Sequence, residues 1–178
     1  MRVRALAPLL TAGLLASAMP ILAAPAPANA AAAADDFSTA RRHVTRAPNP
    51  APVVTAIRAG HHPRFDRVTV TLRGGAPGFD VRYVRRLHRE GSGQVVDLLG
   101  PASLELVLLP ASGHDPDTGD ATVTTPLRRA WRLDQLRETA VIGDFEAVFN
   151  VGVGLHRRAP FRVLTLQHPT RIVVDVRH

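Results

Sequence analysis

The feature that most constrains this chain is a strict alternation of apolar and polar residues, interrupted by glycine and proline. Between residues 67 and 73, valine and leucine alternate with arginine and threonine, and isoleucine or valine recurs at every second position from 172 to 176. In an extended strand a period of two places the apolar side chains on one face, and that face must be buried against a second layer. The alternation therefore predicts an all-β fold.

The same pattern recurs in short segments separated by turn-forming residues. Glycine and proline gather at residues 74–78, 91–93 and 100–101, where we expect the chain to turn. Residues 110–125 are expected to form a long loop, and residues 127–138 fit either a short helix or an irregular edge. Short strands at this spacing are typical of a sandwich or a barrel. The predicted strands are 67–73, 79–83, 95–99, 104–108, 141–142, 147–153, 161–166 and 172–176.

The first thirty residues have the layout of a secretory signal. Arg2 and Arg4 precede an apolar run over residues 5–22, and Ala28-Asn29-Ala30 gives the small-x-small pattern that signal peptidase reads. A membrane anchor is the alternative, but prolines interrupt the run and an Ala/Pro tract follows where a stop-transfer flank would lie. We therefore expect cleavage after Ala30, no stable membrane span afterwards, and a secreted or cell-envelope location.

Three regions are predicted along the chain: a signal peptide at 1–30, a flexible Ala/Pro-rich linker at 31–52 and one domain at 53–178. The linker has no apolar period, so it cannot bury enough surface to offset its ordering entropy. About 148 residues remain after cleavage, and a chain of this length can bury a sufficient core without the disulfides that the absence of cysteine excludes.

The charge of the chain favours anionic partners. All 22 basic residues are arginines, and removing Arg2 and Arg4 from the formal net charge of +7 leaves +5. Such a charge steers anions toward the protein but does not define a site. Nucleic acid is not an expected partner of an exported protein, and few aromatic residues accompany the arginines as a base-stacking surface would require.

Seven short motifs follow one another between residues 65 and 178. They are FDRV at 65–68, PGFDVRYV at 77–84, GSG at 91–93, GDFE at 143–146, GVGL at 152–155, PFRV at 160–163 and PTRIVVDV at 169–176. In this order they resemble the AMIN-like domain of exported actinobacterial proteins, a family related to the AMIN domain that accompanies cell-wall amidases.

The resemblance implies a compact β-sandwich of two small sheets and a role in binding cell-wall material or positioning envelope partners. Fold kinship alone transfers poorly to function. The sequence departs from the family in two respects. It holds no amidase catalytic domain, and Ala147 stands where the family pattern usually has a glycine after Phe-Glu, which puts the bend at that point in question.

Arginine clusters are the candidate ligand-binding residues. Planar guanidinium groups bind carboxylates and phosphates through two points, and peptidoglycan carboxylates, teichoic-acid phosphates and lipid head groups are the anions available outside the membrane. The alternative is a solvated surface in a protein that uses no lysine. The predicted partner is an anionic cell-wall polymer or an envelope protein. The predicted contacts are Arg82, Arg85, Arg86, Arg157 and Arg158.

Neither a metal site nor catalytic chemistry is predicted. The loop histidines His61, His62 and His114 match no helical metal-ligand spacing, and the acidic loop at 114–120 departs from the calcium-loop pattern. Thiol chemistry is impossible without cysteine, and the serine in GSG is not a nucleophile elbow. We therefore expect a binding module without a cofactor. The alternatives are a small secreted hydrolase whose site only the fold assembles, and an adaptor that pairs through a sheet edge.

Overall fold

The computed structural model describes residues 36–178, so the predicted signal peptide and the start of the predicted linker lie outside the described residues. Within 36–178 the chain forms strands and no helix. The strands are β1 (Arg42–Val44), β2 (Val53–His62), β3 (Phe65–Arg73), β4 (Gly78–Val84), β5 (Leu87–His88), β6 (Val95–Val96), β7 (Ala102–Leu109), β8 (Arg128–Ala130), β9 (Leu136–Phe145), β10 (Val148–Leu155), β11 (Phe161–Leu166) and β12 (Thr170–Arg177).

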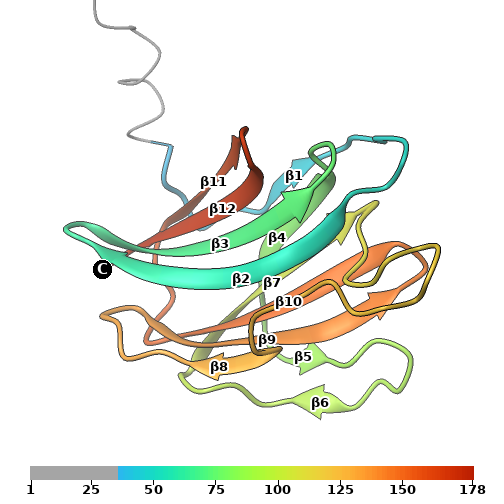
Figure 1. Cartoon of the computed structure of the whole chain (residues 1–178). Helices are drawn as coiled ribbons and strands as arrows, with labels where there is room; N and C mark the ends of the chain where they lie inside the picture. Colours follow the sequence, from blue (N-terminus) through green and yellow to red (C-terminus); the bar gives the residue numbers. More distant parts are fainter. Residues whose placement is uncertain (1–35) are drawn as a thin grey trace, which may run out of the picture.

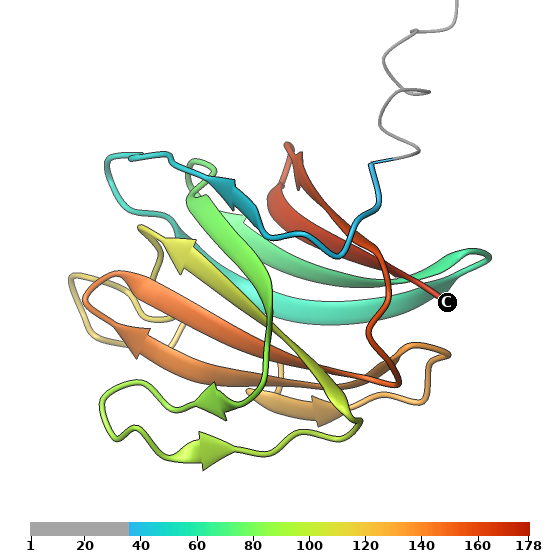
Figure 2. The same cartoon turned by 180° about the vertical axis from the view of Figure 1, so that it is seen from behind.

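Two antiparallel sheets pack face to face, as Figures 1 and 2 show from opposite sides. One sheet has the order β1-β4-β7-β10-β9-β8, and the other has the order β11-β12-β3-β2. The short ribbon β5-β6 lies beyond the larger sheet. The predicted all-β sandwich is therefore confirmed. Of the two readings of residues 127–138, the edge is the one observed, because β8 is a short exposed strand at the margin of its sheet.

The core lies between the sheets and follows the predicted alternation. In β3 the residues Val68, Val70 and Leu72 are buried, and they share one cluster with the buried leucines of β7. A second, smaller cluster lies under the β5-β6 ribbon, where Leu87 packs with Ile142 of β9. The larger sheet is thus covered on both faces in its central part, which explains why burial in β10 runs without interruption from its fourth residue.

The predicted linker differs from the structure over residues 36–52. Strand β1 pairs with β4, and Ser38 exchanges two backbone hydrogen bonds with Phe161. The close approach depends on Gly78, since a Cβ there would lie 2.7 Å from the carbonyl oxygen of Val44 and 2.9 Å from that of Leu109. The segment has little apolar surface of its own. It is ordered by pairing with β4, which the composition of the segment alone does not reveal.

A buried carboxylate connects the two sheets at one end of the sandwich. Asp66 of β3 is 1% exposed, and its Oδ2 accepts hydrogen bonds from the backbone N–H groups of Gln135, at 2.6 Å, and Leu136, at 2.9 Å. These groups begin β9 in the opposite sheet. Because a buried carboxylate is stable only when such donors satisfy it, Asp66 fixes where β9 begins relative to β3.

A second buried carboxylate lies on the outer face of the smaller sheet. Asp175 is fully buried and binds Arg67 through Nε at 2.6 Å and Nη2 at 2.9 Å, and Arg162 through Nε at 2.9 Å. The ion pair raises the pKa of Arg67, chiefly through the hydrogen bond to Asp175. The three residues lie on neighbouring strands β3, β12 and β11, so the carboxylate connects three of the four strands of that sheet.

Replacing Asp175 is expected to destabilise the domain strongly. Asp175→Ala leaves two largely covered guanidinium groups without their carboxylate, and removal of one partner of a buried ion pair typically costs about 3–5 kcal/mol. The free energy of unfolding, measured by urea denaturation, should fall by that amount. The control is Asp117→Ala, which removes an exposed carboxylate and should change the value little. An equal effect of both substitutions would contradict the role of Asp175.

The turn between β9 and β10 shows why the family pattern usually has a glycine where this chain has Ala147. Phe145 and Val148 pair directly, so Glu146 and Ala147 form a two-residue turn, with φ of 48° and 57°. Positive φ at both central residues is the geometry that favours glycine, because a Cβ is strained there. The bend is thus a tight hairpin turn that this sequence makes with a residue poorly suited to it.

Ala147→Gly is therefore expected to stabilise the domain by about 0.5–1 kcal/mol. This value is the strain that the substitution relieves, reduced by the entropy that glycine adds to the unfolded chain. Thermal denaturation should show a higher Tm. Ala130→Gly, at an ordinary position in strand β8, is the matched control and should lower the Tm. A lower Tm for Ala147→Gly would contradict this account.

Candidate anion-binding surface

Several chain segments meet at the end of the sandwich where Asp66 lies. The β2–β3 turn, the β8–β9 and β10–β11 connections and the end of β12 gather there (Figure 1). Gln135 joins them, because its carbonyl accepts a hydrogen bond from the N–H of His156 at 2.7 Å and its side-chain Nε2 donates to the carbonyl of Arg157 at 2.9 Å. The connection that carries Arg157 and Arg158 is thereby fixed against the β8–β9 connection.

Arg82, one of the predicted contacts, is engaged within the domain. Its guanidinium lies 2.6 Å from Glu105 of β7 and 3.2 Å from Asp80. Asp80 also binds Arg41. Burial alone would raise the pKa of Asp80, but the two arginines outweigh it and lower that pKa below its ordinary value. The charge of Arg82 is therefore largely balanced by neighbouring carboxylates, which makes it the weakest of the predicted ligand contacts.

The other four predicted contacts lie in exposed connections. Arg85 and Arg86 follow β4, and Arg157 and Arg158 follow β10. Tyr83 links the two segments: its hydroxyl donates to the carbonyl of Ala159 at 2.6 Å and accepts from the N–H of Ala159 at 2.9 Å. The structure thus brings the β10–β11 connection against the end of β4, an association that spacing in the sequence does not indicate.

Tyr83 also positions one of these arginines. The guanidinium carbon of Arg158 lies 4.8 Å from the centre of the Tyr83 ring, within the range of a cation–π contact. Burial raises the pKa of the Tyr83 hydroxyl above its ordinary value, while the bond to Ala159 and the charge of Arg158 act in the opposite sense. The phenol therefore stays neutral at physiological pH and holds Arg158 at the surface.

A concavity of about 380 Å³ opens at the same end. Two of its walls are aromatic, since Phe37 and Phe65 lie with ring centres 6.1 Å apart. Arg162 lies 4.7 Å and Arg177 lies 4.5 Å from the centre of the Phe37 ring. Guanidinium groups held over ring faces are oriented before a ligand arrives. The lining residues are Phe37, Pro63, Arg64, Phe65, Arg162, Arg177 and His178.

This concavity was not predicted as a site. Phe37 falls in the segment that was expected to be a linker, and Arg64 lies in the tight turn between β2 and β3. Arg162 and Arg177 come from different strands and meet only because β11 pairs with β12. Phe37 is an aromatic residue in a segment with few large apolar side chains, and this was the available sign that residues before 52 contribute to the domain.

The serine, histidine and carboxylate nearest to one another do not form a catalytic relay. Ser112 Oγ and Asp144 Oδ2 both contact Nδ1 of His114, at 2.9 Å and 3.1 Å. A serine hydrolase needs the hydroxyl and the carboxylate on different nitrogens of the ring. Ser112 Oγ also contacts the carbonyl and the N–H of His114, at 3.0 Å and 3.1 Å. The hydroxyl thus takes part in a local turn.

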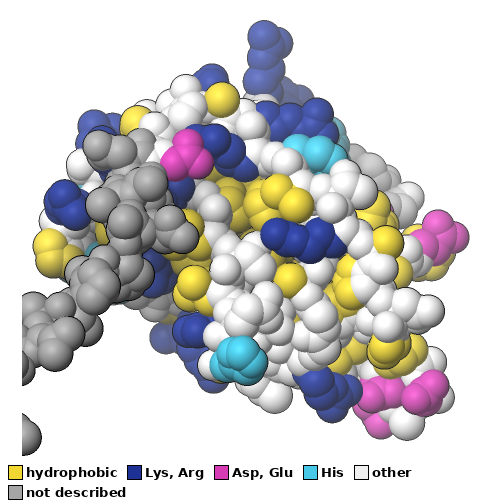
Figure 3. All heavy atoms as spheres, turned by 90° about the horizontal axis from the view of Figure 1, so that it is seen from above, with side chains coloured by type: hydrophobic (Ala, Val, Ile, Leu, Met, Phe, Trp, Pro, Cys, Tyr) yellow, Lys and Arg dark blue, Asp and Glu magenta, His cyan; other side chains and the backbone are white. Residues whose placement is uncertain are grey.

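Arginines are distributed over the surface in separate groups. In the space-filling view from above, basic side chains lie apart, with neutral and hydrophobic side chains between them (Figure 3). Some are balanced locally, as Arg128 is by Glu138, whose pKa is lowered mainly by the hydrogen bond from Arg128. On this face the arginines therefore form separate groups rather than one continuous basic surface.

Comparison with known proteins agrees with this architecture. A family model described as the AMIN-like domain matches residues 52–178, well over half of the chain. The chain belongs to the AMIN-like domain family. No curated protein and no solved structure matches it. The resemblance inferred from the seven motifs is confirmed.

The structure gives several family motifs a physical role. In FDRV, Phe65 lines the concavity, Asp66 connects the two sheets and Arg67 binds Asp175, which belongs to the last motif. These motifs therefore stabilise the arginine-rich end of the AMIN-like domain. Over residues 36–178 the structure contains no helix with the length and hydropathy of a membrane span.

Tyr83→Phe is expected to release the β10–β11 connection while keeping the ring under Arg158. The substitution removes both hydrogen bonds to Ala159, and each bond contributes about 1 kcal/mol. Hydrogen exchange should show faster exchange of the Ala159 amide with little change in strands β7 and β10. Unchanged protection of that amide would contradict the proposed anchoring.

Proposed function

We propose that this AMIN-like domain is an exported, non-catalytic module that binds an anionic polymer of the cell envelope at its arginine-rich end. The observation that carries the proposal is the concavity in which arginines stand over two phenylalanine rings, beside the exposed connection with Arg157 and Arg158. Export rests on the secretory layout of the first thirty residues and on the family relationship.

The chemistry of this end suits a repeating anion. Guanidinium groups form two-point hydrogen bonds with carboxylates or phosphates, and exposed guanidinium groups are present at Arg64 in the concavity and at Arg157 and Arg158 in the adjacent connection. A polymer carries its charges at intervals, so weak contacts at separate arginines act together on one chain. The net positive charge of the domain increases the rate of encounter.

The concavity is more selective than a charged surface would be. Phe37 and Phe65 present ring faces, which pack against the apolar faces of sugar rings or of peptide side chains. A glycan or peptide bearing carboxylates fits both the aromatic and the basic walls. We therefore place carboxylate-bearing wall polymer first among the proposed ligands, ahead of an envelope protein.

The proposal is tested by co-sedimentation of the full chain with purified cell walls. Arg157→Gln/Arg158→Gln removes two exposed charges, each worth about 0.2–1 kcal/mol, so the affinity should fall by roughly 2- to 30-fold. Arg64→Gln tests the concavity in the same assay. Retention of the unaltered protein should weaken as salt is raised, because exposed charges are screened.

Arg73→Gln is the matched control for Arg64→Gln, since each removes one positive charge and Arg73 lies at the other end of β3, where it pairs with Asp115. It should leave retention near that of the unaltered protein. Absence of retention at low salt would refute polymer binding. Equal losses for Arg73→Gln and Arg64→Gln would show attraction by net charge without a site.

A further inference from the structure

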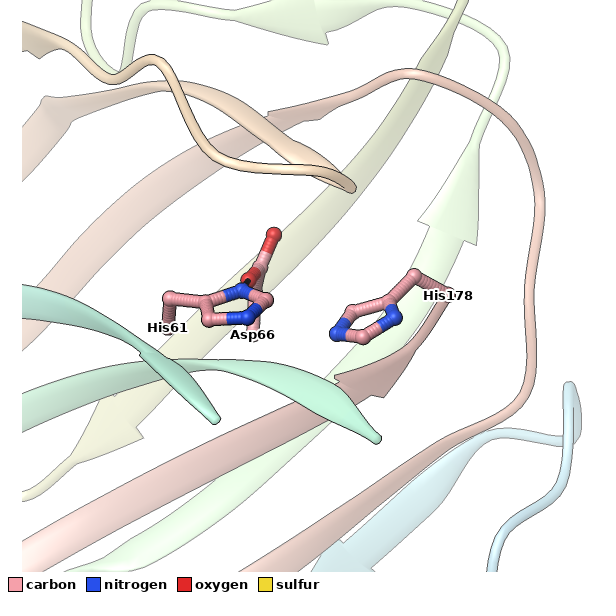
Figure 4. Close-up of side chains that lie close together, drawn as sticks. All are labelled: His61, Asp66 and His178. Atoms are coloured by element: carbon pink, nitrogen blue, oxygen red, sulfur yellow. Dashed lines mark hydrogen bonds and ion pairs between the residues drawn. The ribbon is translucent and has the colours of Figure 1, made fainter. Parts of the chain in front are cut away.

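Two histidines from opposite ends of the domain sequence lie side by side beside Asp66. The ring centres of His61, in β2, and His178, after β12, are 5.1 Å apart (Figure 4). His61, Asp66 and His178 each offer one ligand atom, and these atoms all lie within 4.8 Å of one another. Of these three residues, only His61 was weighed as a ligand from the sequence. His178 was not, because pairing of β12 and β2 with β3 is needed to bring the two together.

We infer that His61, Asp66 and His178, together with Asp134, form a binding site for a zinc ion. Asp134 Oδ2 lies 3.8 Å from His61 Nδ1 and 3.9 Å from His178 Nδ1, and Asp66 Oδ1 lies 3.1 Å from His61 Nδ1. Ligand atoms at about 2.0–2.2 Å from zinc in a tetrahedron are separated by roughly 3.3–3.6 Å. Small rotations of the side chains therefore suffice to close the site.

The hydrogen bonds around the cluster leave the required lone pairs free for metal. The carbonyl of His62 can only accept, so His178 Nε2, at 3.1 Å, donates its proton to it and Nδ1 keeps a lone pair. Asp66 Oδ2 is occupied by two backbone N–H groups, while Oδ1 faces His61. Because these bonds fix Oδ2, they also orient Oδ1, as hydrogen bonds to the outer atoms of ligating side chains do in metal sites.

Zinc would replace a proton in this cluster. Without metal, His61 Nδ1–H donates to Asp66 Oδ1. A neutral imidazole that binds metal through Nδ1 carries its proton on Nε2, so solvent takes the Nδ1 proton and supplies one to Nε2, and Nδ1 and Oδ1 become ligands. The pairing of two imidazoles with two carboxylates favours zinc over calcium or magnesium, which prefer oxygen ligands throughout. Four protein ligands are typical of a structural site. The ion would join β2, β3, β12 and the β8–β9 connection.

The test uses the full chain purified without a histidine tag and stripped with EDTA. Calorimetric titration with zinc chloride should show one equivalent bound, with affinity that rises with pH because protons compete for the ligands. Calcium chloride should show no binding. Zinc should also raise the Tm, since it binds the folded state. This inference does not depend on the proposed polymer binding.

Asp134→Asn and His178→Ala alter partly exposed side chains outside the core clusters and should each weaken zinc binding by about ten-fold or more. His156→Ala removes an exposed histidine from the same end and is the matched control, which should bind as the unaltered protein does. Circular dichroism confirms that each variant is folded. Absence of saturable binding, or an equal loss in His156→Ala, would overturn the site.

Discussion

The arginine-rich end of this domain depends on the carboxylate of Asp66. It lies in the interior, where an ionised group is costly unless hydrogen-bond donors surround it. The donors come from the first residues of β9 in the opposite sheet, at 2.6 Å and 2.9 Å. These hydrogen bonds are directional, whereas the apolar contacts between the two sheets are not. The interaction therefore fixes the position of one sheet relative to the other. Each connection at that end is placed relative to Asp66.

The position of Gln135 shows how the constraint spreads. Its backbone N–H is held by Asp66, its carbonyl accepts from His156, and its side chain donates to the carbonyl of Arg157. Through this single residue, the alignment of the two sheets also determines where the exposed basic connection lies. Tyr83 fixes the same connection from the other side, through Ala159. The exposed Arg157 and Arg158 therefore lie on a supported connection, so the proposed binding would cost little ordering entropy.

The alternation of residues allowed the core to be predicted because it depends only on local geometry. Val68, Val70 and Leu72 are buried as their spacing indicates, and the turns fall near the predicted glycines. The pairing of β1 with β4 was missed because hydrogen bonds to a distant strand leave no periodic signal in a short segment. The bend at Ala147 was raised only by comparison with the family pattern, because alanine by itself does not indicate a positive φ.

The site was less predictable than the fold, and the arginines show why. A guanidinium group in the sequence carries the same charge wherever it lies, but in the structure Arg67 and Arg162 share the buried Asp175 while Arg82 is held by Glu105. Only pairing of strands decides which arginines meet a carboxylate and which meet solvent. In a domain without cysteine, such ion pairs and Asp66 provide directional connections between strands that disulfides could otherwise supply. The same residue type therefore stabilises the fold on the strands and remains exposed to solvent in the connections.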